Sequence, residues 1–512
     1  MEPLRAPSPP TAWQSPGVIL LISLLIFASS AKSLLYDTLD PDLFWHLRVA
    51  QQLQEDGIGP LVDDISFASI KEPWTPYSWL AELGMAKIWQ VGGYRLTLVV
   101  QAGMVAALLL LITLTCALRA GIQDRKAGYD ATASPGSGLR VAAASAFAAF
   151  HCLPFLSFRP VMGALVALAF VVYLIVRDRF YERMTRALWL SVPLCLILAN
   201  VHLFTFLIPV LFMATAVAAY MDRLGAPVIR RFVMLAGMTG LASLCTPMLP
   251  GIVTTIARYQ FQDVMVSGPF IAETQPFYSG VAGKIGLMLV LLATITIICR
   301  YKRLAAADWL WLAIAYVLLF KLARFSPIYA ILSAPILCAT LPRLSDRPLG
   351  RPVVVGAMAI ILLVGLVRVV QLFPSGTVPV EAWVNRNGPD LPGYPADAAR
   401  FVKMHVKPKT GRIVNEFSWG GYLAWELKDR FAILSDGRTQ LYTSDFWKAA
   451  YFGSEAEQLR LLANTKADAA ILPVRRSRYE VLLRKLGWDT IYSDSRAVVL
   501  TPPQPTAMLT QE

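Results

Sequence analysis

The feature that most limits the fold of this chain is a series of eleven apolar segments, most of them close to the length of a membrane-spanning helix. A helix needs about 20 apolar residues to cross the hydrocarbon core of a bilayer. The 512 residues are 56% hydrophobic and only 16% charged, which excludes an intrinsically disordered chain. We therefore predict a mainly α-helical, polytopic membrane protein with about eleven transmembrane helices, over residues 16–35, 94–118, 141–157, 160–176, 187–203, 205–221, 232–250, 283–299, 307–322, 326–342 and 352–373.

Lys and Arg gather in alternate loops, and this alternation predicts how the chain crosses the membrane. With a cytoplasmic N-terminus, each of the five short loops on that side carries three or four basic residues. The long outer loop 36–93 carries three basic residues against nine acidic ones. Because the net charge of +13 comes largely from the short loops, we expect no nucleic-acid partner. Cleavage of segment 16–35 as a signal peptide is an alternative that also leaves the outer loop outside.

The last part of the chain differs in kind from the membrane segments. Residues 374–395 are rich in Pro and Gly and are expected to form a linker. Helix and strand patterns then alternate over residues 396–512, which predicts a small extracytoplasmic α/β domain. The membrane domain accordingly covers residues 1–373. The six cysteines show no C-x-x-C spacing, so a thiolate metal site or a disulfide framework is not expected.

The outer loop is expected to hold two helices that lie on the membrane surface. DLFWHLRVAQQLQEDG places apolar residues on one side of a helix that Pro41 can begin and Gly57 can end. WTPYSWLAELGMAKIWQVGG, from Trp74, has the aromatic side chains typical of the membrane interface. A turn-rich connector with Asp63 and Asp64 separates the two.

The stretch DTLDPDLFWH directly follows the first apolar segment and places carboxylates at the membrane surface. Placing a carboxylate beside hydrocarbon is costly, which suggests a function for it. Partial desolvation brings the proton affinity of such a group toward that of a usable general base, so Asp40 and Asp42 are candidates. Either residue could instead cap the following helix, a common role for Asp, and the loop alone leaves both readings open.

Further polar residues are expected at the same outer face, at the ends of different helices. These residues are Arg159, His202, Glu273, Lys321 and Arg324. A single snorkelling arginine is ordinary in a membrane protein. Residues of both signs at one face indicate a site for an anionic head group together with a base. His202 has a structural alternative, which is to be held by neighbouring helices.

Several short motifs lie in these outer segments and in the C-terminal region. The outer segments contain D-x-D-L-F-W-H-L (from Asp40), D-x-x-S-F (Asp63–Phe67), P-W-x-x-x-W-L (Pro73–Leu80), N-x-H (Asn200–His202), I-x-E (Ile271–Glu273) and R-F (Arg324–Phe325). The C-terminal region contains N-E-F-S-W-G-G-Y-L (Asn415–Leu423) and D-G-R (Asp436–Arg438). Together these motifs resemble bacterial polytopic glycosyltransferases of the C-type fold, related to the dolichyl-phosphate-mannose–protein mannosyltransferases (family 39-like) and the aminoarabinose transferases.

The resemblance implies a mechanism and a set of partners. C-type enzymes transfer a sugar, usually with inversion, from a polyprenyl-phosphate or -diphosphate carrier to a glycan, lipid or protein acceptor on the non-cytoplasmic face of the membrane. The base would be Asp42 or Asp40, and Asp42 matches better because it directly precedes L-F-W-H. The expected phosphate-binding residues are Arg159, Arg324 and Lys284. The expected substrate-binding residues are His46, Asp63, Asp64, His202 and Glu273.

Cofactor use and function class both have alternatives at this stage. Two or more of the loop carboxylates could hold a divalent cation, Mg or Mn, on a diphosphate donor, whereas a monophosphate donor needs none. A transporter or flippase of lipid-linked saccharides is the rival class, but its polar residues would lie near the middle of the membrane, often within repeats. A catalytically inactive scaffold for glycan assembly is a third possibility. The expected location is the bacterial inner membrane.

Overall fold

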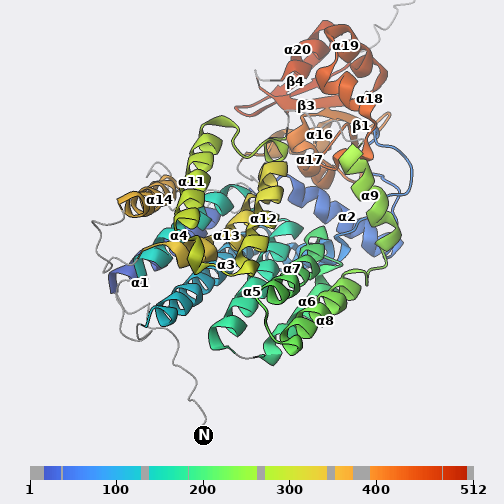
Figure 1. Cartoon of the computed structure of the whole chain (residues 1–512). Helices are drawn as coiled ribbons and strands as arrows, with labels where there is room; N and C mark the ends of the chain where they lie inside the picture. The colour runs from blue at the N-terminus through green and yellow to red at the C-terminus, as the bar shows by residue number, and fades with distance from the viewer. Residues whose placement is uncertain are drawn as a thin grey trace, which may run out of the picture. The chain divides into compact units, whose positions relative to one another are not determined.

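The computed structural model describes residues 16–35, 39–128, 138–182, 184–261, 271–342, 352–372, 393–474 and 477–503 (Figure 1). The chain forms two compact units. The first comprises Met1–Asp37, Leu96–Thr246 and Ile271–Thr377, and the second comprises Thr38–Arg95, Pro247–Phe270 and Val378–Glu512. The outer loop, which we had assigned to the membrane domain, therefore belongs to the same compact unit as the C-terminal domain. Most of the expected linker 374–395 lies outside the described residues.

The first unit is built from helices that overlap the expected apolar segments, although several are shorter than expected. They are α1 (Pro16–Leu35), the second part of α3 (Trp79–Lys126), α4 (Gly138–Cys152), α5 (Pro160–Tyr181), α6 (Ser191–Leu198), α7 (Leu207–Met221), α8 (Ala226–Ser243), α11 (Gly280–Cys299), α12 (Ala306–Lys321), α13 (Ser326–Thr340) and α14 (Pro352–Leu372). Within the described residues, six helical segments are long and apolar enough to cross a membrane: Trp79–Lys126, Gly138–Phe155, Pro160–Tyr181, Leu203–Met221, Gly280–Cys299 and Ala323–Thr340. This arrangement is that of a polytopic membrane protein.

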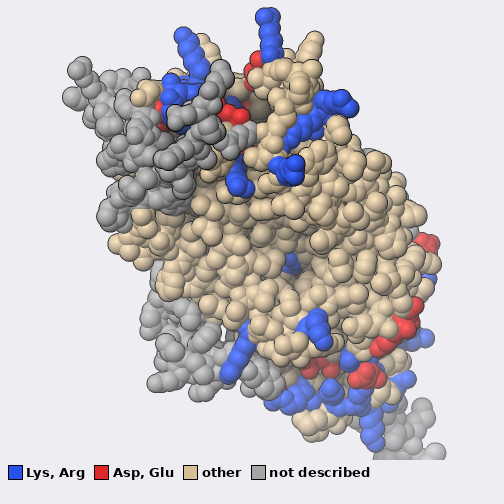
Figure 2. All heavy atoms as spheres, turned by 90° about the horizontal axis from the view of Figure 1, so that it is seen from below, with Lys and Arg blue, Asp and Glu red and all other residues tan. Residues whose placement is uncertain are grey.

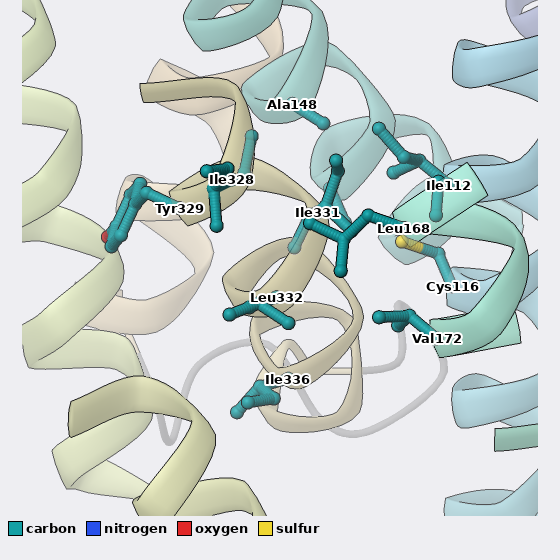
Figure 3. Packing of buried hydrophobic residues seen from close by; sticks show 14 of the residues in the cluster. Ile112, Cys116, Ala148, Leu168, Val172, Ile328, Tyr329, Ile331, Leu332 and Ile336 are labelled. Atoms are coloured by element: carbon teal, nitrogen blue, oxygen red, sulfur yellow. The ribbon is translucent and has the colours of Figure 1, made fainter. Parts of the chain in front are cut away.

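Helix α13 is the centre of this unit. Every one of its residues is buried, and its apolar side chains pack against α4, α5 and α12. Figure 3 shows Ile331 and Leu332 of α13 among side chains of the neighbouring helices, including Leu168 of α5. At one edge, Gly365 of α14 lies so close to α4 that an added Cβ would be 2.4 Å from the Cβ of Ala146. Small residues at such crossings let membrane helices approach closely.

Several cations that the sequence marked as topology signals lie in ion pairs. Arg119 and Arg179 both contact the carboxylate of Asp308, with N–O distances of 2.8 and 3.3 Å. Arg140 pairs with Asp124 at 2.7 Å. On the face drawn in Figure 2, Lys and Arg side chains gather along two opposite edges, and the broad surface between them carries few charges. Pairing lowers the cost of keeping these side chains beside an apolar region.

The second unit contains a five-stranded mixed sheet in the order β2-β1-β3-β5-β4. Strands β1 (Arg412–Asn415), β2 (Ala432–Ile433) and β3 (Ala469–Pro473) are parallel, and β5 (Ala497–Thr501) runs antiparallel to β3 and to β4 (Asp489–Ser493). Its helices are α2 (Asp42–Asp56), the start of α3, α9 (Leu249–Phe261), α16 (Ala396–His405), α17 (Gly420–Glu426), α18 (Ser444–Trp447), α19 (Glu455–Asn464) and α20 (Arg478–Lys485). The expected α/β domain is therefore present.

The second surface helix differs from its prediction at its start. We expected it from Trp74, but the helix begins at Trp79. The backbone of Trp74 instead pairs with that of Leu61, with N–O distances of 2.8 and 2.9 Å. Pro76 disfavours helical geometry at the residue before it, which agrees with the later start. The helix then continues to Lys126 through a kink at Gly93, where φ is 52°.

Candidate functional site

The connector of the outer loop forms an extra edge on the sheet of the C-terminal domain. The amide of Phe67 donates to the carbonyl of Ile433 at 3.0 Å, and the amide of Ile433 donates to the carbonyl of Ile65 at 3.1 Å. The hydroxyl of Ser66 donates to the carbonyl of Leu434 at 2.8 Å. Strand β2 is the edge strand, so its free backbone groups can accept this pairing. The D-x-x-S-F motif is thus a docking segment within the second unit.

A buried charge cluster fixes this docking segment. Arg438 donates from Nη1 to Asp63 at 2.6 Å and from Nη2 to Asp436 at 2.7 Å, and all three side chains are fully buried. Burial by itself would raise the pKa of Asp63, but the charge of Arg438 and hydrogen bonds from Ser69, Arg438 and Ser66 outweigh it and lower that pKa. Asp63 is therefore an ionised anchor between the loop and the D-G-R motif.

Asp64, the next residue, has a different environment. Its carboxylate accepts a 2.6 Å bond from Arg48 of α2, and its side chain is 47% exposed. Partial burial raises the pKa of Asp64, and the charge of Arg48 only partly offsets this effect. The two adjacent acids that we expected to act together on substrate therefore face different partners.

The start of α2 separates the roles of the two candidate bases. The carboxylate of Asp40 accepts a 2.9 Å hydrogen bond from the amide of Asp42, so Asp40 caps the helix. Asp42 lies in the first turn of α2, where negative charge is favoured by the helix dipole. Tyr394 donates to the carbonyl of Leu39 just before this turn. Burial, together with the nearby charges of Asp40 and Asp42, raises the pKa of Tyr394 far above its ordinary value.

Glycines of the C-terminal domain lie directly against this turn. An added Cβ on Gly421 would be 2.7 Å from the carbonyl oxygen of Pro41 and 3.2 Å from the amide of Trp45. An added Cβ on Gly437 would be 2.3 Å from Oδ1 of Asp42. An added Cβ on Gly420, the other glycine at the start of α17, would be 2.1 Å from the carbonyl oxygen of Ser435, so both glycines permit close packing of the backbone.

His46 is held by a carboxylate that the sequence did not single out. Its Nδ1 lies 3.2 Å from Oε1 of Glu82, and both side chains are buried. Ser78 donates to the same oxygen at 3.2 Å. This contact ties α2 to the start of α3. Glu82 could have been singled out from the sequence, because it is the one carboxylate in a stretch of mostly apolar and aromatic residues, and a buried carboxylate requires a partner.

In the first unit, three of the expected site residues lie together. Nη1 of Arg159, before α5, donates to Oε1 of Glu273 at 2.9 Å. Nη2 of Arg324, before α13, lies 3.7 Å from Oε2 of the same carboxylate. The three side chains are between a quarter and about a third exposed. Two arginines that share one partly exposed carboxylate carry net positive charge and form a candidate anion-binding group.

The other expected residues of the first unit have separate positions. His202 caps a short 3-10 turn (Leu203–Phe206), and its Nδ1 accepts a 3.2 Å bond from the amide of Phe204, a local contact that tests neither substrate binding nor contact with neighbouring helices. Lys284 is exposed on α11 and forms no ion pair with any described residue.

Two of the loop carboxylates that could hold a divalent cation, Asp63 and Asp64, are already engaged by other groups. Asp63 is taken by Arg438 and by the amides of Ile65 and Ser66, while Asp64 is paired with Arg48. In the described part of the chain, no three His, Cys, Asp or Glu side chains gather as ligands. We derive no step through a divalent cation.

Likeness to solved structures gives this polytopic membrane protein the C-type glycosyltransferase fold. Two solved structures of ArnT from Cupriavidus metallidurans, a glycosyltransferase of this fold, are similar to the chain. The apo structure has 13% sequence identity and a TM-score of 0.51, covering 96% of this chain and 99% of that one. The structure bound to undecaprenyl phosphate has 13% identity and a TM-score of 0.50, covering 96% and 100%.

A further similar structure and the sequence comparisons carry less weight. The oligosaccharyltransferase AglB from Archaeoglobus fulgidus has 12% identity and a TM-score of 0.42, covering 97% of this chain and 75% of its own, which is too distant to support an argument. No protein-family model matches the sequence, and no curated protein does so either.

Proposed function

We propose that this protein is a membrane glycosyltransferase that transfers a sugar from a polyprenyl-phosphate-linked donor to an acceptor. The observation that carries the proposal is the fold, which is similar to that of ArnT over 96% of this chain. In this fold the outer loop holds Asp42 in the first turn of α2. The ArnT structure bound to undecaprenyl phosphate makes an undecaprenyl carrier the natural choice of donor. The charge pattern supports a bacterial inner-membrane protein with a cytoplasmic N-terminus and catalysis on the outer side.

Asp42 acts as the general base in this proposal. The acceptor hydroxyl oxygen bonds to the anomeric carbon while its proton passes to Asp42. The bond between that carbon and the carrier phosphate oxygen breaks, the electron pair leaves on the phosphate, and the configuration inverts. Asp42 is preferred to Asp40, because it directly precedes the L-F-W-H sequence of the motif and lies in the first turn of α2.

Arg159 and Arg324 bind the departing carrier phosphate. A phosphate monoester is a good leaving group when its charge is neutralised, so two guanidinium groups supply what the reaction requires without a strong acid. Glu273 holds these groups as a pair when no phosphate is bound. Lys284, exposed on α11, adds positive charge for the same carrier. His46 supports α2 through Glu82, and Asp63 anchors the loop instead of contacting substrate.

The test uses the purified full-length protein with undecaprenyl-phosphate sugars and an acceptor pool from the cell envelope. We expect Asp42→Asn to lose at least about 100-fold in transfer rate, because a general base contributes about 10²–10⁴-fold. The unfolding temperature and donor affinity should stay unchanged. Asp40→Asn should keep most of the activity and lose some stability. Transfer at the parental rate by Asp42→Asn would disprove the base assignment. Movement of donor across vesicles without transfer would favour the transporter class.

A further inference from the structure

We propose that Gly437 of the C-terminal domain is a positioning residue for Asp42, and that this domain thereby completes the catalytic site. The inference rests on the proposed function, because it deals with the residue assigned as base. Its starting point is a close approach within the second unit. A Cβ on Gly437 would lie 2.3 Å from Oδ1 of Asp42 and 3.2 Å from Nε1 of Trp45.

The need for glycine at this position is steric. Gly437 is not among the glycines with positive φ, so its backbone conformation is open to other residues. What excludes a side chain is the carboxylate of Asp42, which occupies the space where a methyl group would be. The backbone at Gly437 therefore forms one wall of the position that this carboxylate takes.

The backbone around Gly437 is itself held firmly. Asn415, at the end of β1, accepts from the amide of Leu434 at 2.8 Å and donates to the carbonyl of Ser435 at 2.8 Å. On the other side, Arg438 is anchored by its two buried carboxylate partners, Asp436 and Asp63. A wall supported on both sides restricts the rotamers of Asp42 in a way that a loop alone would not.

Two motifs of the C-terminal region supply these contacts with the first turn of α2. The first motif supplies Asn415 and Gly421, and an added Cβ on Gly421 would press on the carbonyl of Pro41, just before α2. The second motif supplies Gly437 and Arg438. Both motifs thus meet the first turn of α2, and they give the C-terminal domain a role in catalysis. A base fixed in its reactive orientation avoids the entropy loss of finding it in each turnover.

Gly437→Ala tests the inference, because the atom it displaces is the end of a flexible side chain. We expect the full-length variant to fold and to bind undecaprenyl phosphate as the parent does, with kcat lowered by at least about tenfold and KM for the donor unchanged. The matched control is Gly84→Ala in α3 of the same unit, where an added Cβ meets nothing within 4 Å. This control should keep the parental kcat. A parental kcat in Gly437→Ala would overturn the inference.

A double-mutant cycle with Asp42→Asn separates positioning from other causes. If Gly437 acts through Asp42, then Gly437→Ala should lower the residual rate of Asp42→Asn by less than twofold. Independent, multiplying losses would overturn the inference while leaving the base assignment intact. If Asp42→Asn keeps full activity, the assignment of Asp42 as the base is wrong, and the role of Gly437 is disproved with it. If Gly437→Ala unfolds, Asp42→Ala in the same chain should restore folding by removing the clashing carboxylate, and failure to do so would also overturn the contact.

Discussion

Replacing Arg438 by Met should destabilise the second unit more than any single change in the outer loop. The guanidinium is fully buried and lies against two fully buried carboxylates, Asp63 and Asp436. Removing one partner of a buried ion pair costs about 3–5 kcal/mol, because an uncompensated charge remains. Here one substitution leaves two carboxylates without their cation, so we expect a loss at the upper end, about 5 kcal/mol.

Substitutions of the neighbouring acids should lower the free energy of unfolding by smaller, graded amounts. Asp63→Asn leaves Arg438 and Asp436 as a balanced pair and loses mainly charge-assisted hydrogen bonds, which should cost about 1–3 kcal/mol. Asp64→Asn removes a pair in which the carboxylate is 47% exposed. Because the guanidinium of Arg48 is only 11% exposed, this variant should lose about 1 kcal/mol, still well below Arg438→Met, and it serves as the partly exposed comparison.

The assay is denaturant unfolding of the full-length protein in detergent, followed by tryptophan fluorescence. Trp74 is a suitable reporter, since the guanidinium of Arg438 lies 5.8 Å from its ring centroid. A triple variant that neutralises Arg438, Asp63 and Asp436 together should recover part of the loss, because no unpaired charge remains. If Arg438→Met unfolds within about 1 kcal/mol of the parent, the reasoning that this cluster anchors the loop is refuted.

Three further predictions concern pH, packing and ligand binding. The pKa of Asp63 lies below its ordinary value of 3.8, so its stabilising effect is complete above that pH and is lost as the pH falls through the lower folded value. The difference in unfolding free energy between parent and Asp63→Asn should therefore shrink in acid, and a growing difference would contradict this. Gly421→Ala should lower the free energy of unfolding by about 1–3 kcal/mol, because the backbone of Pro41 must move; unchanged thermal unfolding would disprove the contact. Glu273→Gln should bind undecaprenyl phosphate more tightly in calorimetry, since Arg159 loses a competing anion, whereas weaker binding would show that Glu273 assists the ligand.

The helices and most strands could be predicted from the sequence. Each expected apolar segment overlaps a helix, and the alternating helix and strand patterns expected over residues 396–512 correspond to a mixed sheet with helices. These features follow from local patterns, since a run of apolar residues must satisfy its backbone hydrogen bonds within its own helix. The start of the second surface helix was predicted wrongly, because the pairing of Trp74 with Leu61 is a tertiary contact.

The sequence by itself determined that the chain crosses a membrane and that its first outer loop carries acids beside an aromatic helix. It did not distinguish Asp63 from Asp64, and it favoured Asp42 over Asp40 only through the position of Asp42 in its motif. The environment of Asp63 depends on Arg438, which lies 375 residues beyond it, and the close contact at Asp42 depends on the backbone at Gly437. Burial and charge pairing are set by whatever packs against a side chain, and for Asp63 and Asp42 that partner comes from the C-terminal domain, which no local pattern near the outer loop reveals.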